Sequence, residues 1–153
     1  LLDRDTCVVP GYNSRLDSLQ AIAAWHGLKV IDEVNDKRRA NAGRYDEGLK
    51  DCPGVTIPPR NPRYKQVFHT YVLQFEQRDD LKELLEATGI DTRIHYPVPC
   101  HLQPAFQFLG YKRGDLPETE RQASRILSLP VHEFLTNEQI DYVIQSIRRF
   151  YGS

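Results

Sequence analysis

A long helical pattern near the start of the chain is the feature that most constrains the fold. Apolar residues recur at helical intervals over residues 14–50, with polar side chains between them. The apolar positions are Leu16, Leu19, Ala23, Val30, Val34, Ala42, Tyr45 and Leu49. A helix of roughly 35 residues extends about 50 Å, which exceeds the width of a small domain. We therefore expect a helix that links two bodies or bends at a weak point, Gly27 or Gly43.

Two segments further along the chain have the pattern of β-strands. VFHTYVLQF is rich in β-branched and aromatic residues, which alternate along the segment as they do in a strand. IDTRIHYP predicts a second strand, which Pro97 ends. We expect these segments to belong to a small sheet of about three strands.

Three helical patterns accompany the predicted strands. RDDLKELLEATG is amphipathic, a second helix is expected over residues 118–127, and a third runs from Thr136 to about Phe150. Thr136 and Gln139 have the spacing of a capping box. The fold class is therefore mixed α/β, of the α+β type, with helices on one side of the sheet and a body over residues 64–151.

Length and charge narrow the classes of protein. The 153 residues correspond to about one domain, so we treat residues 1–153 as a single unit. The formal net charge of −1 gives no basic excess for binding nucleic acid. No run of about 18 apolar residues occurs, and the first ten residues lack the pattern of a signal peptide, so we expect a soluble, cytoplasmic protein with no membrane partner.

The cysteines and the missing methionine add two further expectations. Cys7, Cys52 and Cys100 are too widely spaced for a zinc pattern and are odd in number, so we interpret them as reduced thiols. The chain contains no methionine, even at position 1, from which we expect a processed protein or a fragment.

The stretch GYNSR, immediately ahead of the long helical pattern, has two interpretations. It places the amide of Asn13, the hydroxyl of Ser14 and the guanidinium of Arg15 at a helix N-terminus, where backbone N–H groups favour a phosphate. Alternatively, Asn13 or Ser14 simply caps the helix, with Asp17 as the reciprocal partner of Ser14.

The stretch IHYPVPCHLQP is the second candidate site. His95 and Tyr96 lie where the predicted strand ends, and Pro97 fixes the chain directly after them, an arrangement that presents side chains to a ligand. The alternative is a turn with an incidental aromatic residue. His95 and His101 also make a weak metal pair, but no third donor is near them in the sequence, so we predict no metal.

These stretches together resemble a known family. GYNSRLDSLQA, KRRANAGRYDEGL and the run from HTYVLQF through IHYPVPCHLQPAFQFLGYKRGDLPETERQASRILSLPVHEFLTNEQIDYVI resemble the C-terminal part of the DegT/DnrJ/StrS family of pyridoxal-phosphate-dependent nucleotide-sugar aminotransferases. The resemblance extends from about Gly11 to Arg148. It implies the small C-terminal domain of a fold-type I aminotransferase, in which residues 14–50 form an interdomain helix and the large domain lies outside this chain.

The resemblance also implies roles for four residues. Asn13 matches an asparagine that reaches across a homodimer to the cofactor phosphate, and Arg15 matches an arginine that meets the diphosphate of the nucleotide sugar. His95 and Tyr96 match a His-Tyr pair that approaches the sugar nucleotide. The Schiff-base lysine of the family belongs to the large domain, so this chain is expected to contain no catalytic residue. Arg93 departs from the family pattern, where a small residue is commoner.

The reaction implied is transfer of an amino group, normally from glutamate, to a nucleotide-linked keto-sugar, with carbon 3 as the expected position. The cofactor is pyridoxal phosphate, the expected assembly is a homodimer with shared active sites, and the isolated chain is expected to be inactive. Two alternatives stay open. A sugar dehydratase of the same family, in which histidine replaces the lysine, would share these motifs, and a non-catalytic binding module would need no large domain.

Overall fold

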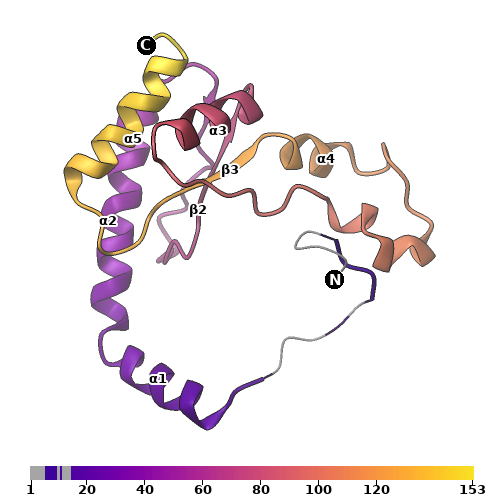
Figure 1. Ribbon diagram of the computed structural model, residues 1–153, viewed down its shortest axis with the longest axis horizontal. Helices are drawn as coiled ribbons and strands as arrows, with labels where there is room; N and C mark the ends of the chain where they lie inside the picture. The colour runs from indigo at the N-terminus through magenta and orange to yellow at the C-terminus, as the bar shows by residue number, and fades with distance from the viewer. Residues whose placement is uncertain (1–5, 10, 12–14) are drawn as a thin grey trace.

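The computed structural model describes residues 6–9, 11 and 15–153. A three-stranded antiparallel sheet and its helices form the body, and Figure 1 shows helix α1 extending from it below. The helices are α1 (Ser18–Leu28), α2 (Ile31–Leu49), α3 (Arg78–Ala87), α4 (Pro117–Ala123) and α5 (Asn137–Phe150). The strands are β1 (Val55–Thr56), β2 (Tyr71–Phe75) and β3 (Ile126–Leu129), and two 3₁₀ helices are η1 (Cys100–Leu102) and η2 (Pro104–Leu109). The predicted mixed fold with a small three-stranded sheet is confirmed.

The central strand β2 divides the sheet into two unlike faces. Its buried residues Tyr71, Leu73 and Phe75 alternate with half-buried Val72 and Gln74, as the period of a strand requires. The buried face joins a core to which α2, α3, β3 and α5 contribute. The residues that form this core are Ala42, Tyr45, Leu49, Cys52, Tyr71, Leu73, Phe75, Leu81, Leu85, Ile90, Leu127, Leu129, Val131, Ile140, Val143, Ile144 and Ile147.

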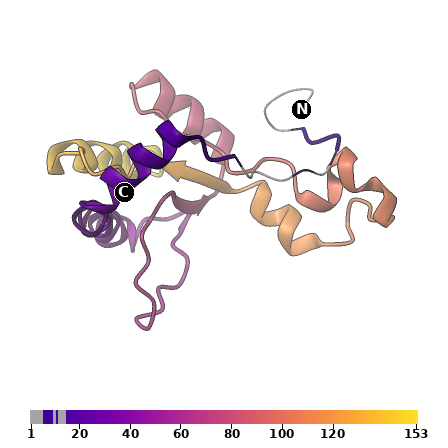
Figure 2. The ribbon, with the colours of Figure 1, turned by 90° about the horizontal axis from the view of Figure 1, so that it is seen from below.

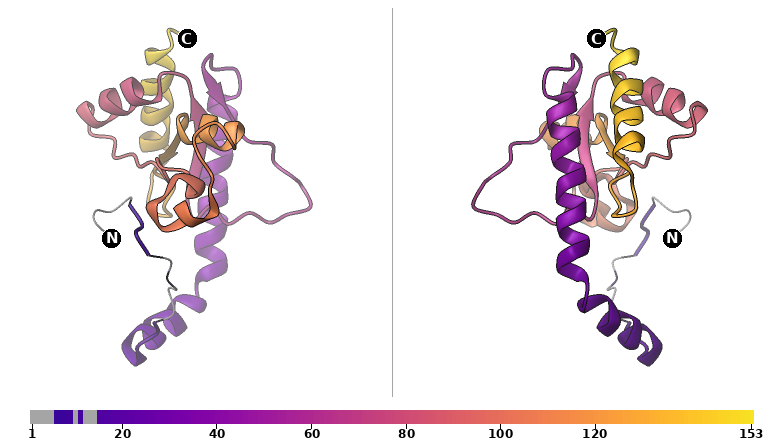
Figure 3. Two further views of the ribbon diagram at one scale, coloured as in Figure 1. Left: turned by 90° about the vertical axis from the view of Figure 1, so that its right-hand side faces the viewer. Right: turned by 90° about the vertical axis from the view of Figure 1, so that its left-hand side faces the viewer.

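Helices α2 and α5 lie side by side at this core (Figure 3). Their close approach requires a glycine, because a Cβ atom at Gly48 would lie 2.6 Å from Cδ1 of Ile144. A hydrogen bond from Arg148 to the Gly48 carbonyl (2.9 Å) and an ion pair between Arg44 and Asp141 (2.6 Å) join the same two helices. The second half of the predicted long helix is therefore part of the core.

The predicted helix over residues 14–50 is divided into two helices in the structure. The break lies at Lys29 and Val30. Their backbone N–H groups donate to the carbonyls three residues earlier, those of His26 (3.2 Å) and Gly27 (3.1 Å), and not to those four residues earlier as in an α-helix. Gly27 is close to this break, whereas Gly43 lies within α2. α1 contains no buried residue, and Figures 1 and 3 show it turning away from α2.

Two predicted elements differ from the observed ones. The strand expected at residues 90–97 makes only an isolated bridge between Arg93 and Ser128 and is otherwise irregular. The helix expected over residues 118–127 ends at Ala123, because the following residues pair with β2 as strand β3. Sheet pairing thus overrides a helical pattern that the local sequence supports.

The other two helical predictions are confirmed. α3 occupies RDDLKELLEA, and α5 begins after Thr136. Thr136 Oγ1 accepts a hydrogen bond from the Gln139 backbone N–H (3.3 Å), and Gln139 Oε1 accepts one from the Thr136 N–H (2.9 Å). This is the reciprocal pattern of a capping box.

Two parts of the chain extend away from the body. η1, η2 and α4 form a lobe at the end opposite α2 and α5, beside the described N-terminal residues (Figures 1 and 2). The Cys7 N–H donates to Gln103 Oε1 (2.9 Å), and the Cys7 carbonyl accepts from the Ala105 N–H (2.9 Å). Residues 57–70, between β1 and β2, form a long loop on another side (Figure 3). No helix within the described ranges is long and apolar enough to cross a membrane.

Candidate functional site

The segment that carries His95 and Tyr96 is attached to the outer strand β3. Arg93 and Ser128 exchange two backbone hydrogen bonds, of 3.2 Å and 2.7 Å. This pairing holds the irregular segment against the sheet two residues before His95. His95 and Tyr96 were expected at the end of a regular strand, but the segment before them makes only this isolated bridge.

The side chains of His95 and Tyr96 have different environments. Nδ1 of His95 lies 2.8 Å from Oγ of Ser128, and the imidazole is half-buried. Tyr96 is 65% exposed, and the two rings meet edge to face with centroids 5.4 Å apart. The peptide bond between them is cis. Thus His95 is fixed by the protein, whereas the Tyr96 phenol is open to a ligand.

A pocket of about 190 Å³ adjoins these two residues. Lys82 and Arg93 contribute cationic side chains to its lining, next to His95 and Tyr96. Lys82 is paired with Glu86, and Arg93 with Asp91 (3.1 Å). The pocket therefore combines aromatic rings with positive charges, a combination that suits an oxygen-rich ligand.

The other two predicted site residues lie at the N-terminal side of α1. Asn13 is outside the described residues. Arg15 is exposed and lies three residues ahead of the helix, whose N-cap is Asp17. The Asp17 N–H donates to Gln20 Oε1 (3.0 Å), so the partner of Asp17 is Gln20. No hydrogen bond or ion pair between described residues joins Arg15 to His95 or Tyr96.

His101 belongs to a different cluster from His95. It is 7% exposed, and its Nε2 lies 3.1 Å from Oε1 of Glu120. Glu120 also accepts the Gly114 N–H (2.8 Å), and these bonds hold the pKa of the Glu120 carboxyl below its usual value. The described residues contain no group of three His, Cys, Asp or Glu side chains that could hold a metal. This pair joins η1 to α4, and sequence reasoning missed it because 19 residues separate the partners.

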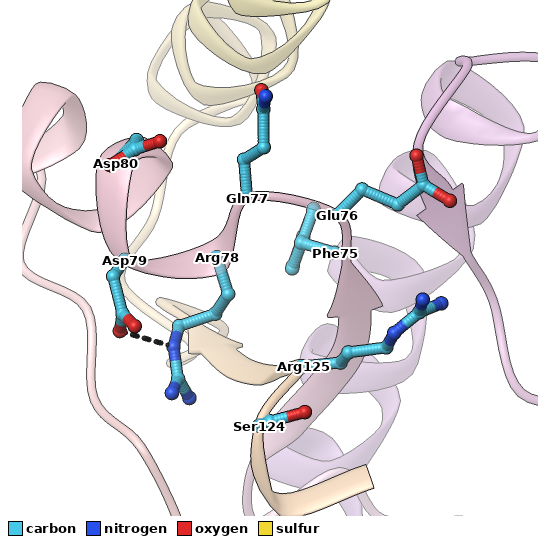
Figure 4. A pocket seen from close by; sticks show the side chains of 8 residues that line it. All are labelled: Phe75, Glu76, Gln77, Arg78, Asp79, Asp80, Ser124 and Arg125. Atoms are coloured by element: carbon cyan, nitrogen blue, oxygen red, sulfur yellow. Dashed lines mark hydrogen bonds and ion pairs between the residues drawn. The ribbon is translucent and has the colours of Figure 1, made fainter. Parts of the chain in front are cut away.

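A second pocket, of about 570 Å³, lies at the start of α3 (Figure 4). Its lining residues are Phe75, Glu76, Gln77, Arg78, Asp79, Asp80, Ser124 and Arg125. Arg78 is buried and donates to the carbonyl of Ile126 (2.9 Å) and to Asp79 Oδ1 (2.6 Å). Because these contacts use the guanidinium to join α3 to β3, we assign Arg78 a structural role.

The described residues do not by themselves form a site for pyridoxal phosphate, which requires a lysine held beside a phosphate anchor. Each of the six lysines is surface-accessible, and four are ion-paired with carboxylates. Lys29 lies 3.9 Å from the centre of the Trp25 ring, and Lys112 is exposed. Lys82 lines the pocket beside His95 and Tyr96, but its ammonium is paired with Glu86.

Comparison with known proteins identifies the class. Residues 3–148 match the DegT/DnrJ/EryC1/StrS aminotransferase family. This match covers nearly the whole chain, and the chain therefore belongs to the DegT/DnrJ/EryC1/StrS family.

The sequence relatives extend well beyond this chain. The pleiotropic regulatory protein of Geobacillus stearothermophilus is 42% identical over 146 residues, which cover 94% of this chain and 39% of the relative. The dTDP-3-amino-3,4,6-trideoxy-alpha-D-glucose transaminase of Streptomyces venezuelae is 40% identical over 140 residues, which cover 92% of this chain and 37% of the relative. The chain thus spans well under half the length of these relatives.

Solved structures agree with the family assignment. DesV of S. venezuelae, in complex with a ketimine intermediate, superposes with a TM-score of 0.86 at 39% identity, covering 94% of this chain and 38% of that one. An aminotransferase of the family from Brucella abortus gives a TM-score of 0.82, also at 39% identity and with the same coverage. Both confirm the predicted small domain of an aminotransferase.

Proposed function

We propose that this chain is the C-terminal part of a pyridoxal-phosphate-dependent aminotransferase that transfers an amino group from glutamate to a nucleotide-linked keto-sugar. The observation that carries the proposal is the match of nearly the whole chain to DesV, at a TM-score of 0.86 and 39% identity. The longer protein that would contain this chain is called the parent below. By this proposal, the cofactor lysine and most of the cofactor pocket belong to the rest of the parent.

The names of the relatives support carbon 3 as the aminated position. The transaminase of S. venezuelae is named for a dTDP-3-amino sugar. A relative from Acidithiobacillus ferrooxidans, 38% identical over 141 residues, is named UDP-N-acetyl-3-dehydro-alpha-D-glucosamine 3-aminotransferase. We therefore propose a dTDP- or UDP-linked 3-keto-sugar as the substrate class.

Within this proposal, the residues of the chain bind and orient the substrate. Arg15 is an exposed guanidinium that can pair with a diphosphate, and Tyr96 offers an exposed phenol to a sugar or phosphate oxygen. His95, fixed against Ser128, can donate to another oxygen of the same molecule. Asn13 is proposed to bind the cofactor phosphate of the neighbouring subunit in a homodimer.

An assay of the parent tests the reaction. The purified parent is incubated with glutamate and dTDP- or UDP-linked 3-keto-hexoses, and both products are followed by mass spectrometry. We expect 2-oxoglutarate and the 3-amino sugar in equal amounts. A deoxy keto-sugar formed with release of ammonia, and with no amino sugar, would instead establish the dehydratase alternative.

Subunit mixing tests the shared site. A variant of the parent that lacks the cofactor lysine and an Arg15→Ala variant should each be nearly inactive as homodimers. After random refolding of an equal mixture, half the dimers are mixed and each holds one intact site, so about a quarter of the wild-type activity should return. Confirmed mixed dimers without recovery would show that Arg15 serves the site of its own chain.

A regulatory role is the second candidate. Two relatives have names of this kind, the pleiotropic regulatory protein of G. stearothermophilus and the sensory transduction protein EryC1 of Saccharopolyspora erythraea, which is 41% identical. A parent that binds nucleotide sugar without consuming glutamate, and whose rest lacks a cofactor lysine, would favour regulation over catalysis.

A further inference from the structure

Ser128 is the polar residue of an otherwise apolar strand. It is 6% exposed, whereas its neighbours Leu127 and Leu129 point into the core. Ser128 pairs with Val72 of β2, and the two therefore share the sheet face opposite the core. On that face its hydroxyl meets the imidazole of His95, 33 residues earlier in the chain.

Three hydrogen bonds connect Ser128 to the His95 segment. Two are backbone bonds with Arg93, and the third joins Oγ of Ser128 to Nδ1 of His95 at 2.8 Å. The backbone bonds position the segment and do not depend on the serine side chain. The hydroxyl bond positions the ring, so a substitution at Ser128 separates these two effects.

The direction of the hydroxyl bond follows from the other contacts of Ser128. Among the described residues, Oγ has one hydrogen-bond partner, Nδ1 of His95. If Nδ1 carried the proton and donated it, the hydroxyl proton of a nearly buried serine would have no acceptor among the described residues, which is unfavourable. If the hydroxyl donates, Nδ1 accepts and both groups are satisfied.

We propose that Ser128 is a positioning residue for substrate binding, whose hydroxyl fixes the neutral imidazole of His95 with its proton on Nε2. Nε2–H is then a hydrogen-bond donor, which suits the phosphate and hydroxyl oxygens of a nucleotide sugar, all of them acceptors. The opposite tautomer would present a lone pair to those oxygens. The substrate in this inference rests on the proposed function, but the tautomer does not.

Nuclear magnetic resonance of the histidine rings tests the tautomer in the 153-residue chain. Long-range ¹H–¹⁵N spectra are recorded at a pH where the rings are neutral, and a His95→Gln variant assigns the His95 signals. We expect the proton on Nε2 and a single ring orientation. A wild-type ring with its proton on Nδ1 would overturn the proposal, whatever the variants do.

Three variants separate positioning from general stability. Ser128→Ala removes the hydroxyl but keeps the backbone pairing, and Ser128→Thr retains a hydroxyl. Ser146→Ala is the matched control, because it deletes another buried serine hydroxyl, which donates to the Tyr142 carbonyl (2.8 Å), far from His95 in the chain. We expect averaging of the His95 ring between orientations in Ser128→Ala alone. Unaltered His95 signals in Ser128→Ala would contradict the proposal.

Binding of dTDP and UDP to the parent provides the second measurement. For the nucleotide that binds wild type more tightly, we expect Ser128→Ala to raise Kd about tenfold, equal to 1.4 kcal/mol, and Ser128→Thr to restore most of the affinity. An unchanged Kd in Ser128→Ala would overturn the role in substrate binding. If the wild-type parent binds neither nucleotide, the proposed function fails, and the ring spectra then show whether Ser128 fixes His95.

Discussion

Helices α1 and α2 are adjacent in the chain but have opposite environments. α2 buries Asn41, Ala42, Tyr45 and Leu49, whereas α1 buries no residue. Yet α1 is the more apolar of the two, and it carries Leu19, Ile22, Trp25 and Leu28 at three-residue intervals, all more than half exposed. An isolated helix of 11 residues is only marginally stable in water and usually depends on packing of its apolar side. Because this core does not cover α1, its apolar side chains must pack against something else.

The difference shows that one continuous apolar pattern can serve two bodies. The α2 part of the pattern is satisfied by α5 and β2 within the described chain. The α1 part remains uncovered, and contiguous exposed apolar residues mark contact surfaces. The chain spans less than two-fifths of its relatives' length, so the rest of the parent is the proposed partner of α1.

A pair of matched leucine substitutions should give the largest contrast. Leu49→Ala in α2 removes a fully buried side chain and should lower the free energy of unfolding by about 2–5 kcal/mol. Leu19→Ala in α1 removes an 81% exposed side chain and should change it by less than about 0.5 kcal/mol. Urea unfolding followed by circular dichroism measures both, and equal losses would show that α1 packs as α2 does.

Two glycine substitutions within α2 should change the free energy of unfolding in opposite directions. A Cβ at Gly48 would meet Ile144 at 2.6 Å, so Gly48→Ala should lower the free energy of unfolding by about 1–3 kcal/mol. Gly43 has no heavy atom within 4 Å of such a Cβ, so Gly43→Ala should raise it by about 0.5–1 kcal/mol through helix propensity. Stabilisation by both changes would contradict the close packing of α2 against α5.

The sequence predicted the elements that depend on neighbouring residues, and it missed those that depend on contacts between distant parts of the chain. α3 and α5 were predicted because amphipathic spacing and the Thr136–Gln139 capping box are local signals. The bend near Gly27 was expected from the glycine, and the helix breaks two residues later at Lys29. The strand that replaces the end of the helix expected over residues 118–127 was missed, because pairing with β2 decides it. At the site, His95 and Tyr96 were found from their own segment, whereas Ser128 was not, since no local pattern links residues 33 apart.

Acid should weaken the contact between α2 and α5. Two hydrogen bonds from Arg44, of 2.7 Å and 2.6 Å, hold the pKa of Asp141 below its usual 3.8. A depressed carboxyl pKa stabilises the folded state above 3.8, and this contribution is lost as the pH falls through the lower folded value. Wild type should therefore exceed Asp141→Asn in urea midpoint at pH 7, and the two should converge near the folded pKa. A gap that persists at that pH would exclude the Arg44–Asp141 pair as its source.

The smallest effect on stability, and the most informative about α1, is expected from a charge on its apolar side. Leu19→Lys alters an exposed residue, so the free energy of unfolding of the monomer should change by less than about 0.5 kcal/mol. In the isolated chain, however, the uncovered residues of α1 have no partner except a second copy, and we expect wild type to sediment above the monomer mass at tens of micromolar. Leu19→Lys should weaken that association at least about tenfold, because a lysine ammonium is costly to desolvate in an apolar contact.

Ala24→Lys is the control, since it adds the same charge to α1 at an exposed residue outside the series of large apolar side chains. Equal weakening by both variants would assign the effect to net charge, and a monomeric wild type would show that α1 needs no cover.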